Sequence, residues 1–373
     1  MIIAPRWPWP PHSGDRARAN LWVEALRGRA EVVVVTPRRD DAGEPGVRVI
    51  GARLSVAALL AGVARALRDR LPLHTLAAAP YAWAAAIREA GPVDCAVVLL
   101  SRLHPWVYRS LGAKRRLLDA IDSASAGMAE RAAAARNPLA RLFWRREARA
   151  MTRLEREAGT KYDRVILVSA AEEHAFGERA TTVAMGVDVG DAPGTHVRPY
   201  DCGFWGRLAY FANSRAAEAL VRDIWPEIRR RRPEATLFIG GADAPEWLRR
   251  YDGRDGITVR SPAGDRGAAL RAVRVILLPV LYGTGVSLKT AEAAEAGCAI
   301  VGTPMAFRGA PDLGAAAIVE PDLGRFAERA VSLLEHTAAA RAAGDALRAI
   351  AVSGHSRDRI RERLAAIALE GLD

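Results

Sequence analysis

The chain has 373 residues, and this length favours two domains of roughly 150–200 residues over a single one. The formal charge of +11 favours anionic partners, among them nucleotides and acidic lipid surfaces. Three well-separated cysteines exclude a disulfide framework or a zinc site, and no basic pattern interleaved with aromatic residues points to nucleic acid.

The N-terminus predicts no signal peptide, because residues 1–4 read as a short strand broken by Pro5. The longest apolar run, 56–64, is too short to span a membrane. We therefore expect a cytoplasmic protein, with peripheral contact at the inner face of an anionic membrane as the alternative. The helical region 55–70 is amphipathic, and packing in the core is favoured over contact with lipid.

Strands and helices alternate through the first half of the chain, and several strands are continuous apolar runs. Such runs are typical of parallel strands that are buried on both faces, and the alternation predicts a doubly wound α/β fold. A helix after Ser169, with Glu172 in the capping-box position, closes this half. The predicted strands are 1–4, 31–37, 47–50, 94–100, 116–122 and 164–169, and the helices are 16–27, 55–70, 80–90 and a charged region at 127–158.

The pattern turns loop-like near Gly186 and then starts again. We expect an N-terminal domain at 1–188, a linker at 189–203 and a C-terminal domain at 204–355, with the terminal helix 356–373 packed back on the first domain. The second half is predicted to hold strands ending at 206 and at 235–241, 257–259, 273–280, 299–304 and 317–319, with helices at 214–231 and 266–272.

A strand, a glycine-bearing turn and a helix follow one another at 277–297. Gly283 and Gly285 let backbone N–H groups approach an anion at the start of the helix, where the helix dipole also favours negative charge. Lys289 and Glu292 follow within the first turns. Leu288 occupies the position that a dinucleotide or ATPase loop fills with glycine, so neither of those motifs is satisfied.

Four passages together resemble the glycosyltransferases of the GT-B fold, most closely those of family 4. The first two passages are shorter, and the last two cover the start of the second domain and the strand–turn–helix element. The passages are 10–18 (PPHSGDRAR), 185–188 (MGVD), 204–213 (FWGRLAYFAN) and 279–303 (PVLYGTGVSLKTAEAAEAGCAIVGT). The resemblance implies two Rossmann-like domains that face each other across an interdomain cleft.

The resemblance also implies transfer of a sugar from a nucleotide-diphosphate sugar to an acceptor hydroxyl, with retention of configuration, in glycan or natural-product biosynthesis. The acceptor is a glycan, a lipid-linked sugar or a small natural product. In this reading Glu292 accepts hydrogen bonds from the ribose, and Lys289 and Arg207 neutralise the leaving diphosphate. The implied donor-binding residues are Gly14, Arg207, Asn213, Gly283, Thr284, Gly285, Lys289 and Glu292.

Catalytic candidates in the first domain follow strand ends or lie in the first loop. Asp122 is expected to orient the acceptor hydroxyl or the transferred sugar, and His12 to contact the donor; Asp119, Ser123 and His104 are the other candidates. The sequence contains no Asp-x-Asp pair, so no metal and no other cofactor is expected.

Three positions depart from the family pattern: Thr284 stands in place of a glutamate, Ala212 in place of a lysine and Arg308 in place of a second glutamate. These departures leave two alternatives open. One is a catalytically silent protein that binds sugar nucleotides or acts as a scaffold. The other is a nucleotide-sugar epimerase or hydrolase on the same fold.

Overall fold

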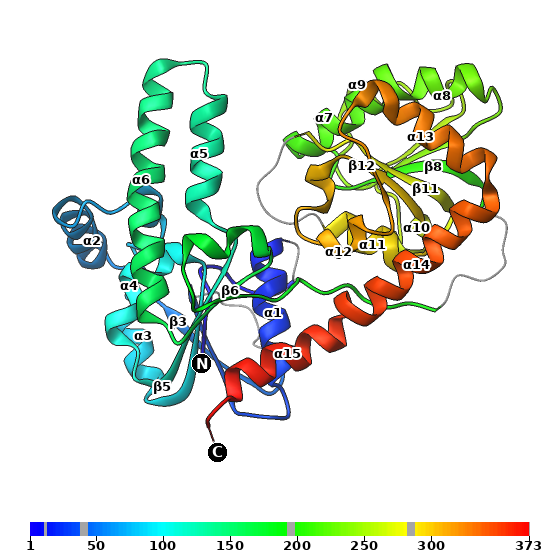
Figure 1. Ribbon diagram of the computed structural model, residues 1–373. Coiled ribbons are helices and arrows are strands. Elements are labelled where there is room, and N and C mark those ends of the chain that lie inside the picture. The colour runs from blue at the N-terminus through cyan, green and yellow to red at the C-terminus, as the bar shows by residue number, and fades with distance from the viewer. Residues whose placement is uncertain (11–12, 38–43, 192–197, 282–287, 373) are drawn as a thin grey trace. The chain divides into compact units, whose positions relative to one another are not determined.

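The computed structural model describes residues 1–10, 13–37, 44–191, 198–281 and 288–372 (Figure 1). The chain divides into two compact units, residues 1–184 with 360–373 and residues 185–359. The first boundary therefore lies after Ala184, a few residues before the predicted one.

The described part of the first unit is built on a parallel sheet in the order β3-β2-β1-β4-β5-β6-β7. Its strands are β1 Ile2–Ile3, β2 Val32–Pro37, β3 Val47–Ala52, β4 Val93–Leu99, β5 Ala113–Ile121, β6 Arg164–Leu167 and β7 Ala180–Thr182. Its α-helices are α1 Gly14–Leu26, α2 Val56–Arg68, α3 Trp83–Ala90, α4 His104–Val107, α5 Ala124–Ala134, α6 Pro138–Lys161 and α15 Arg357–Leu369. Short 3-10 helices include η1 Leu73–Ala78 and η4 Ala170–Ala175.

The second unit holds a parallel sheet in the order β10-β9-β8-β11-β12-β13 within its described residues. Its strands are β8 Tyr200–Trp205, β9 Leu237–Gly240, β10 Ile257–Arg260, β11 Val273–Leu278, β12 Ala299–Gly302 and β13 Ile318–Val319. Its helices are α7 Phe211–Ala219, the π-helical η5 Leu220–Ile224, α8 Trp225–Arg231, α9 Glu246–Arg249, α10 Arg266–Arg271, α11 Leu288–Glu295, η6 Pro304–Phe307, α12 Pro311–Gly314, α13 Leu323–Glu335 and α14 Thr337–His355.

Both sheets reverse their strand order, at β1/β4 in the first unit and at β8/β11 in the second. Loops on either side of such a reversal leave in opposite directions, which opens a crevice at the carboxyl ends of the strands where ligands bind. Two doubly wound parallel sheets confirm the predicted pair of Rossmann-like domains.

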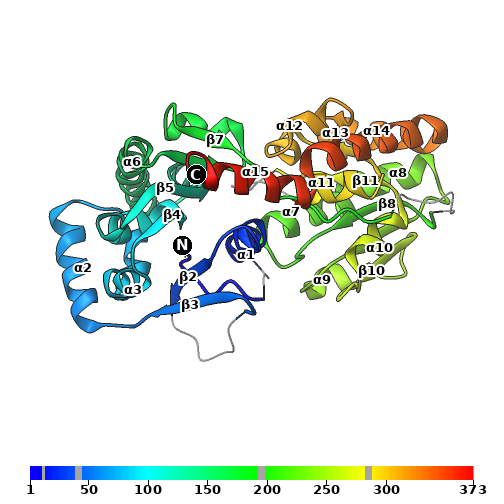
Figure 2. The ribbon, with the colours of Figure 1, turned by 90° about the horizontal axis from the view of Figure 1, so that it is seen from below.

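The C-terminal helix α15 completes the core of the first unit. Ile360, Leu364 and Ala368 are buried with Leu21 and Trp22 of α1, and Figure 2 shows the two helices side by side. In the first unit, helices α5 and α6 form an antiparallel hairpin that projects from the sheet (Figure 1).

Two local predictions are wrong. Residues 200–203 belong to strand β8 and not to a linker, because Tyr200 and Cys202 pair with Val273 and Val275 of β11. Ser169 does not cap the following helix with its side chain, and the Glu172 carboxylate instead accepts a hydrogen bond from the Ser123 N–H at 2.7 Å.

Candidate functional site

The start of α11 holds two partly buried groups of opposite charge, Lys289 and Glu292. Glu292 Oε1 lies 2.9 Å from Nη1 of Arg266, the first residue of α10. The side chain of Glu292 is mostly buried and that of Arg266 is half exposed. Arg266 therefore fixes the orientation of the Glu292 carboxylate from a neighbouring helix.

Burial shifts the titration of both groups. It lowers the pKa of Lys289, which the nearby Glu292 charge opposes, and it raises the pKa of Glu292, which Arg266 and Lys289 oppose. Among the described residues, no acceptor or carboxylate lies within bonding distance of the Lys289 ammonium. A largely desolvated cation without a counter-ion is costly, and it is a place where an anionic ligand is stabilised.

The end of β8 lies directly against Lys289. A Cβ atom added at Gly206 would lie 2.6 Å from Lys289 Cε and 2.9 Å from Asn213 Nδ2, so a larger residue there would displace these two side chains. Asn213 Nδ2 in turn donates to the Arg207 carbonyl at 2.8 Å. The structure thus brings Arg207, Asn213 and Lys289 together at the carboxyl edge of the sheet, beside the β8/β11 reversal.

A second glycine holds the neighbouring strand ends close together. A Cβ atom at Gly241 would lie 1.7 Å from the Gly206 carbonyl oxygen, and the φ of Gly241 is 145°. Two backbone hydrogen bonds, from Gly206 N to Gly240 O at 3.1 Å and from Leu208 N to Ala242 O at 2.8 Å, join the same turns. The close approach of the two turns places the backbone at Gly206 beside Lys289.

Arg207 extends away from the sheet. Its side chain is 73% exposed, and its Nε donates to Asp243 Oδ2 at 2.7 Å. Sequence reasoning missed Asp243 and Arg266 as partners. Neither has a local motif, since 36 residues separate Asp243 from Arg207 and 26 separate Arg266 from Glu292.

In the first unit, Asp122 follows β5 and lines a cavity of about 230 Å³ together with Arg6, Asp15, His74 and Arg102. Burial, and secondarily the charge of Glu172, raise the pKa of Asp122 to about 6, against the opposing effect of Arg102. This carboxyl therefore titrates within reach of neutral pH, as a group that exchanges protons with a substrate does.

The other candidates in this unit have structural partners. Asp119 is fully buried and is held by Arg18 Nε at 2.6 Å and Trp22 Nε1 at 2.6 Å. Ser123 Oγ donates to Glu155 at 2.9 Å. His104 Nδ1 lies 3.2 Å from the Tyr162 hydroxyl, and burial lowers the pKa of this imidazole to about 4. These contacts explain the three groups without a ligand.

Gly14 is the first residue of α1, and a Cβ atom added there would meet nothing within 4 Å. His12, Gly283, Thr284 and Gly285 lie outside the described residues. The predictions made for these four residues stay predictions.

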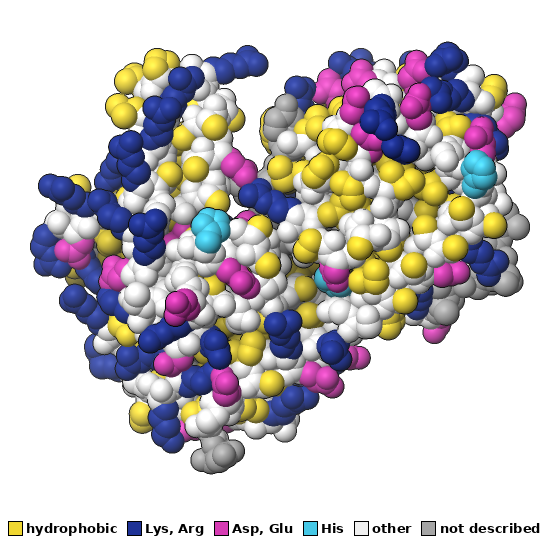
Figure 3. Space-filling view, in the orientation of Figure 1, with side chains coloured by type: hydrophobic (Ala, Val, Ile, Leu, Met, Phe, Trp, Pro, Cys, Tyr) yellow, Lys and Arg dark blue, Asp and Glu magenta, His cyan; other side chains and the backbone are white. Residues whose placement is uncertain are grey.

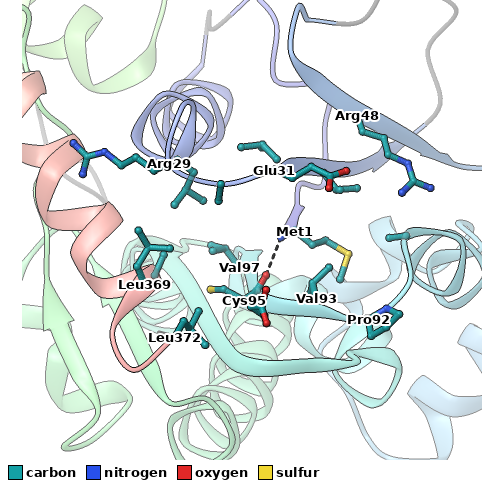
Figure 4. A pocket seen from close by; sticks show the side chains of 17 residues that line it. Met1, Arg29, Glu31, Arg48, Pro92, Val93, Cys95, Val97, Leu369 and Leu372 are labelled. Atoms are coloured by element: carbon teal, nitrogen blue, oxygen red, sulfur yellow. Dashed lines mark hydrogen bonds between the residues drawn. The ribbon is translucent and has the colours of Figure 1, made fainter.

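Another cavity, of about 460 Å³, lies at the opposite edge of the first sheet, where the strands begin (Figure 4). Two of its polar groups have partners: the Met1 ammonium donates to the Cys95 carbonyl at 2.8 Å, and Arg48 donates to the Glu89 carbonyl at 3.2 Å. This cavity shares no lining residue with the one that holds Asp122.

Within the described ranges, no three His, Cys, Asp or Glu side chains gather in a metal-binding arrangement. In the same part of the chain, no helix has the length and apolarity needed to cross a bilayer.

Solved structures with the same fold cover almost the whole chain. WaaG, a glycosyltransferase involved in lipopolysaccharide biosynthesis, is 16% identical over 99% of both chains with a TM-score of 0.65. HepE of Anabaena, in complex with UDP, is 14% identical over 98% of both chains with a TM-score of 0.66. An E. coli trehalose-6-phosphate protein bound with UDP-2-fluoro glucose is 13% identical over 99% of this chain and 98% of that one, with a TM-score of 0.67.

The two parallel sheets and these neighbours show that the chain has the GT-B fold. Residues 199–336, which contain Arg207, Asn213, Lys289 and Glu292, match the family model described as Glycosyl transferases group 1. The C-terminal unit is therefore a group 1 glycosyl transferase domain, and the predicted enzyme class is confirmed. Among curated proteins, none matches the sequence.

Proposed function

We propose that the protein transfers a sugar from a nucleotide-diphosphate sugar to an acceptor hydroxyl. The observation that supports this most is the partly buried Lys289 ammonium, which has no bonded partner among the described residues and lies against the glycine backbone at the end of β8. A diphosphate placed there supplies the missing negative charge. Two of the solved neighbours of this fold contain UDP or a UDP-sugar analogue.

In this proposal each polar group has one task. Lys289 stabilises the charge that grows on the leaving diphosphate, and the exposed Arg207 adds a second cation from the turn after β8. Glu292, oriented by Arg266, accepts hydrogen bonds from the vicinal ribose hydroxyls. Asn213 holds the Arg207 carbonyl and so fixes the turn beside the phosphates.

We further propose that the leaving diphosphate is neutralised by these cations rather than by a metal ion, and that the sugar keeps its anomeric configuration. Retention is carried over from the resemblance to family 4. Asp122 is proposed to orient the acceptor hydroxyl and receive its proton, because its raised pKa suits proton exchange near neutral pH. Gly14 would let the first loop approach the donor without a side chain in the way.

The test is release of a nucleoside diphosphate from a panel of sugar nucleotides offered with candidate glycan and natural-product acceptors. The wild type is expected to release it from at least one donor, and Glu292→Gln is expected to release it at a rate at least about tenfold lower, with addition of EDTA leaving the wild-type rate unchanged. Binding of a nucleotide without turnover against any acceptor would instead support a catalytically silent binding protein.

A further inference from the structure

Helix α2 is arranged with its small residues toward the protein. Gly62 and Ala66 are buried, and a Cβ atom at Gly62 would lie 2.7 Å from Ala79 Cβ and 3.4 Å from the Trp106 ring. A surface helix of a water-soluble domain normally places its large apolar residues on this side. The predicted packing of the apolar side chains of α2 in the core is therefore wrong.

The large apolar side chains of α2 point into solvent. Leu60 is 66% exposed and Leu67 is 69% exposed. They belong to one face at helical spacing, which consists of Val56, Leu59, Leu60, Val63 and Leu67, with Leu54 exposed just before the helix. An apolar face of this size on a folded unit marks an interaction surface.

Basic side chains lie at both ends of this face. The segment 53–70 carries four arginines against one acidic residue, Asp69, which Arg65 and Arg68 already engage. Arg53 and Arg70 are exposed at its two ends. Exposed apolar side chains with arginines at both ends of the helix are typical of helices that lie in a membrane interface.

The α5–α6 hairpin also carries exposed arginines and exposed apolar side chains. Leu71, just after α2, packs against the small cluster of Met128, Met151 and Leu154, so the end of α2 lies against the hairpin. Residues 131–156 carry eight arginines, all exposed, and only two glutamates, Glu147 and Glu155, both of which are buried. Leu139, Leu142 and Phe143 are exposed near the tip. In Figure 3, basic side chains gather along this side of the first unit, over α6 and α2.

We propose that the outward face of α2 is a membrane-docking surface that inserts its leucines among the lipids of an anionic bilayer, with the arginines of α2 and α6 on the headgroups. The charge decides between the possible occupants. A second copy of this chain would place its own arginines against the same arginines of the first copy, and like charges repel each other. An anionic lipid surface instead attracts each arginine that comes near it. This proposal does not depend on the transfer activity.

The first test is co-sedimentation of the full chain with sucrose-loaded vesicles. Wild-type protein is expected to bind mixed phosphatidylglycerol–phosphatidylcholine vesicles, to bind pure phosphatidylcholine poorly, and to lose binding as salt rises. Leu60→Glu is expected to weaken partition roughly tenfold or more. Val63→Glu and Val352→Glu form a matched pair, since Val63 of α2 is 37% exposed and Val352 of α14 is 36% exposed; only the first should weaken binding.

The second test reports insertion directly. The native cysteines are buried or partly buried with raised pKa values, so a single introduced cysteine can be labelled selectively with an environment-sensitive dye. Dye on Leu60→Cys is expected to shift to the blue with anionic vesicles, and dye on Val352→Cys is not. Equal partition of wild type and Leu60→Glu, or no shift at position 60, would overturn the proposal. Self-association in the absence of lipid that Leu60→Glu abolishes would assign the face to a second copy instead.

Discussion

At the scale of single residues, the informative groups are ionisable side chains whose charged form is disfavoured by burial. Asp122 is one: burial and the neighbouring Glu172 disfavour its ionised form. Its pKa in the folded state, about 6, lies above the ordinary value of 3.8. Between pH 3.8 and about pH 6 the carboxyl is therefore protonated in the folded state and ionised in the unfolded state. The contribution of Asp122 to stability is therefore greatest below about pH 4 and is lost as the pH rises through about 6.

Asp122→Asn tests this assignment. The variant is expected to unfold at higher denaturant concentration than wild type at pH 7, by up to about 3 kcal/mol, and to match it near pH 4. Turnover should fall, and the acidic limb of the wild-type pH–rate profile near pH 6 should disappear. A variant that is less stable than wild type at pH 7, or that keeps the same acidic limb, would contradict the role given to Asp122.

Two glycines make a second comparison at this scale. Gly241→Ala would force a methyl group to within 1.7 Å of the Gly206 carbonyl oxygen, and it is expected to destabilise the second unit by roughly 3 kcal/mol or more. Gly14→Ala meets no neighbour at the start of α1 and should leave thermal unfolding unchanged or raise its midpoint slightly. Equal unfolding midpoints for the two variants would show that the close approach at Gly241 is not required.

At the scale of elements, α11 is held in place by α14. Arg348 Nη1 lies 2.7 Å from Glu295 Oε1, its Nη2 donates to the Gly190 carbonyl at 2.8 Å, and both side chains are mostly buried. Glu295 also accepts from the Gly190 N–H at 2.9 Å. The helix that carries Lys289 and Glu292 is thus held at its far end by this ion pair and by the hydrogen bonds of both side chains to Gly190.

Arg348→Met is expected to lower the free energy of unfolding by about 3 kcal/mol, because it leaves the buried Glu295 charge without its counter-ion. Adding Glu295→Gln should restore part of the loss. Arg230→Met, which breaks the exposed pair with Glu227, serves as the control and should leave stability unchanged. If the double variant were as unstable as Arg348→Met, the buried charge would not be the cause.

Elements also show what the sequence can and cannot predict. Apolar runs located most strands of both sheets, because strands buried on both faces leave a strong local signal. The spacing of Leu60, Val63 and Leu67 identified a helical face but not the side on which the protein lies, since periodicity is the same for either orientation. Pairs such as Arg18–Asp119, 101 residues apart, leave no local pattern and become visible only in the fold.

At the scale of the whole molecule, the C-terminal residues 360–373 belong to the first unit, although the second unit precedes them in the chain. Leu364 of α15 is fully buried in the first core, whereas Leu369 on the same helix is 36% exposed. Leu364→Ala is expected to destabilise the first unit by about 2–5 kcal/mol, and Leu369→Ala by much less. Because Lys289 and Glu292 belong to the other unit, nucleotide affinity should be the same in both variants, as measured under conditions where each is folded. A large loss of affinity in Leu364→Ala alone would contradict the independence of the two cores.

The central claim is that the edge of the second sheet around Lys289 binds a nucleoside diphosphate. Calorimetric titration of the full chain with UDP, GDP, TDP and ADP tests it most directly. We expect one of the four to bind the wild type, Lys289→Met to bind it at least about tenfold more weakly, and Lys161→Met, which removes an exposed lysine of α6, to bind it as the wild type does. Binding of none of the four, or equal affinity in Lys289→Met and wild type, would contradict the account.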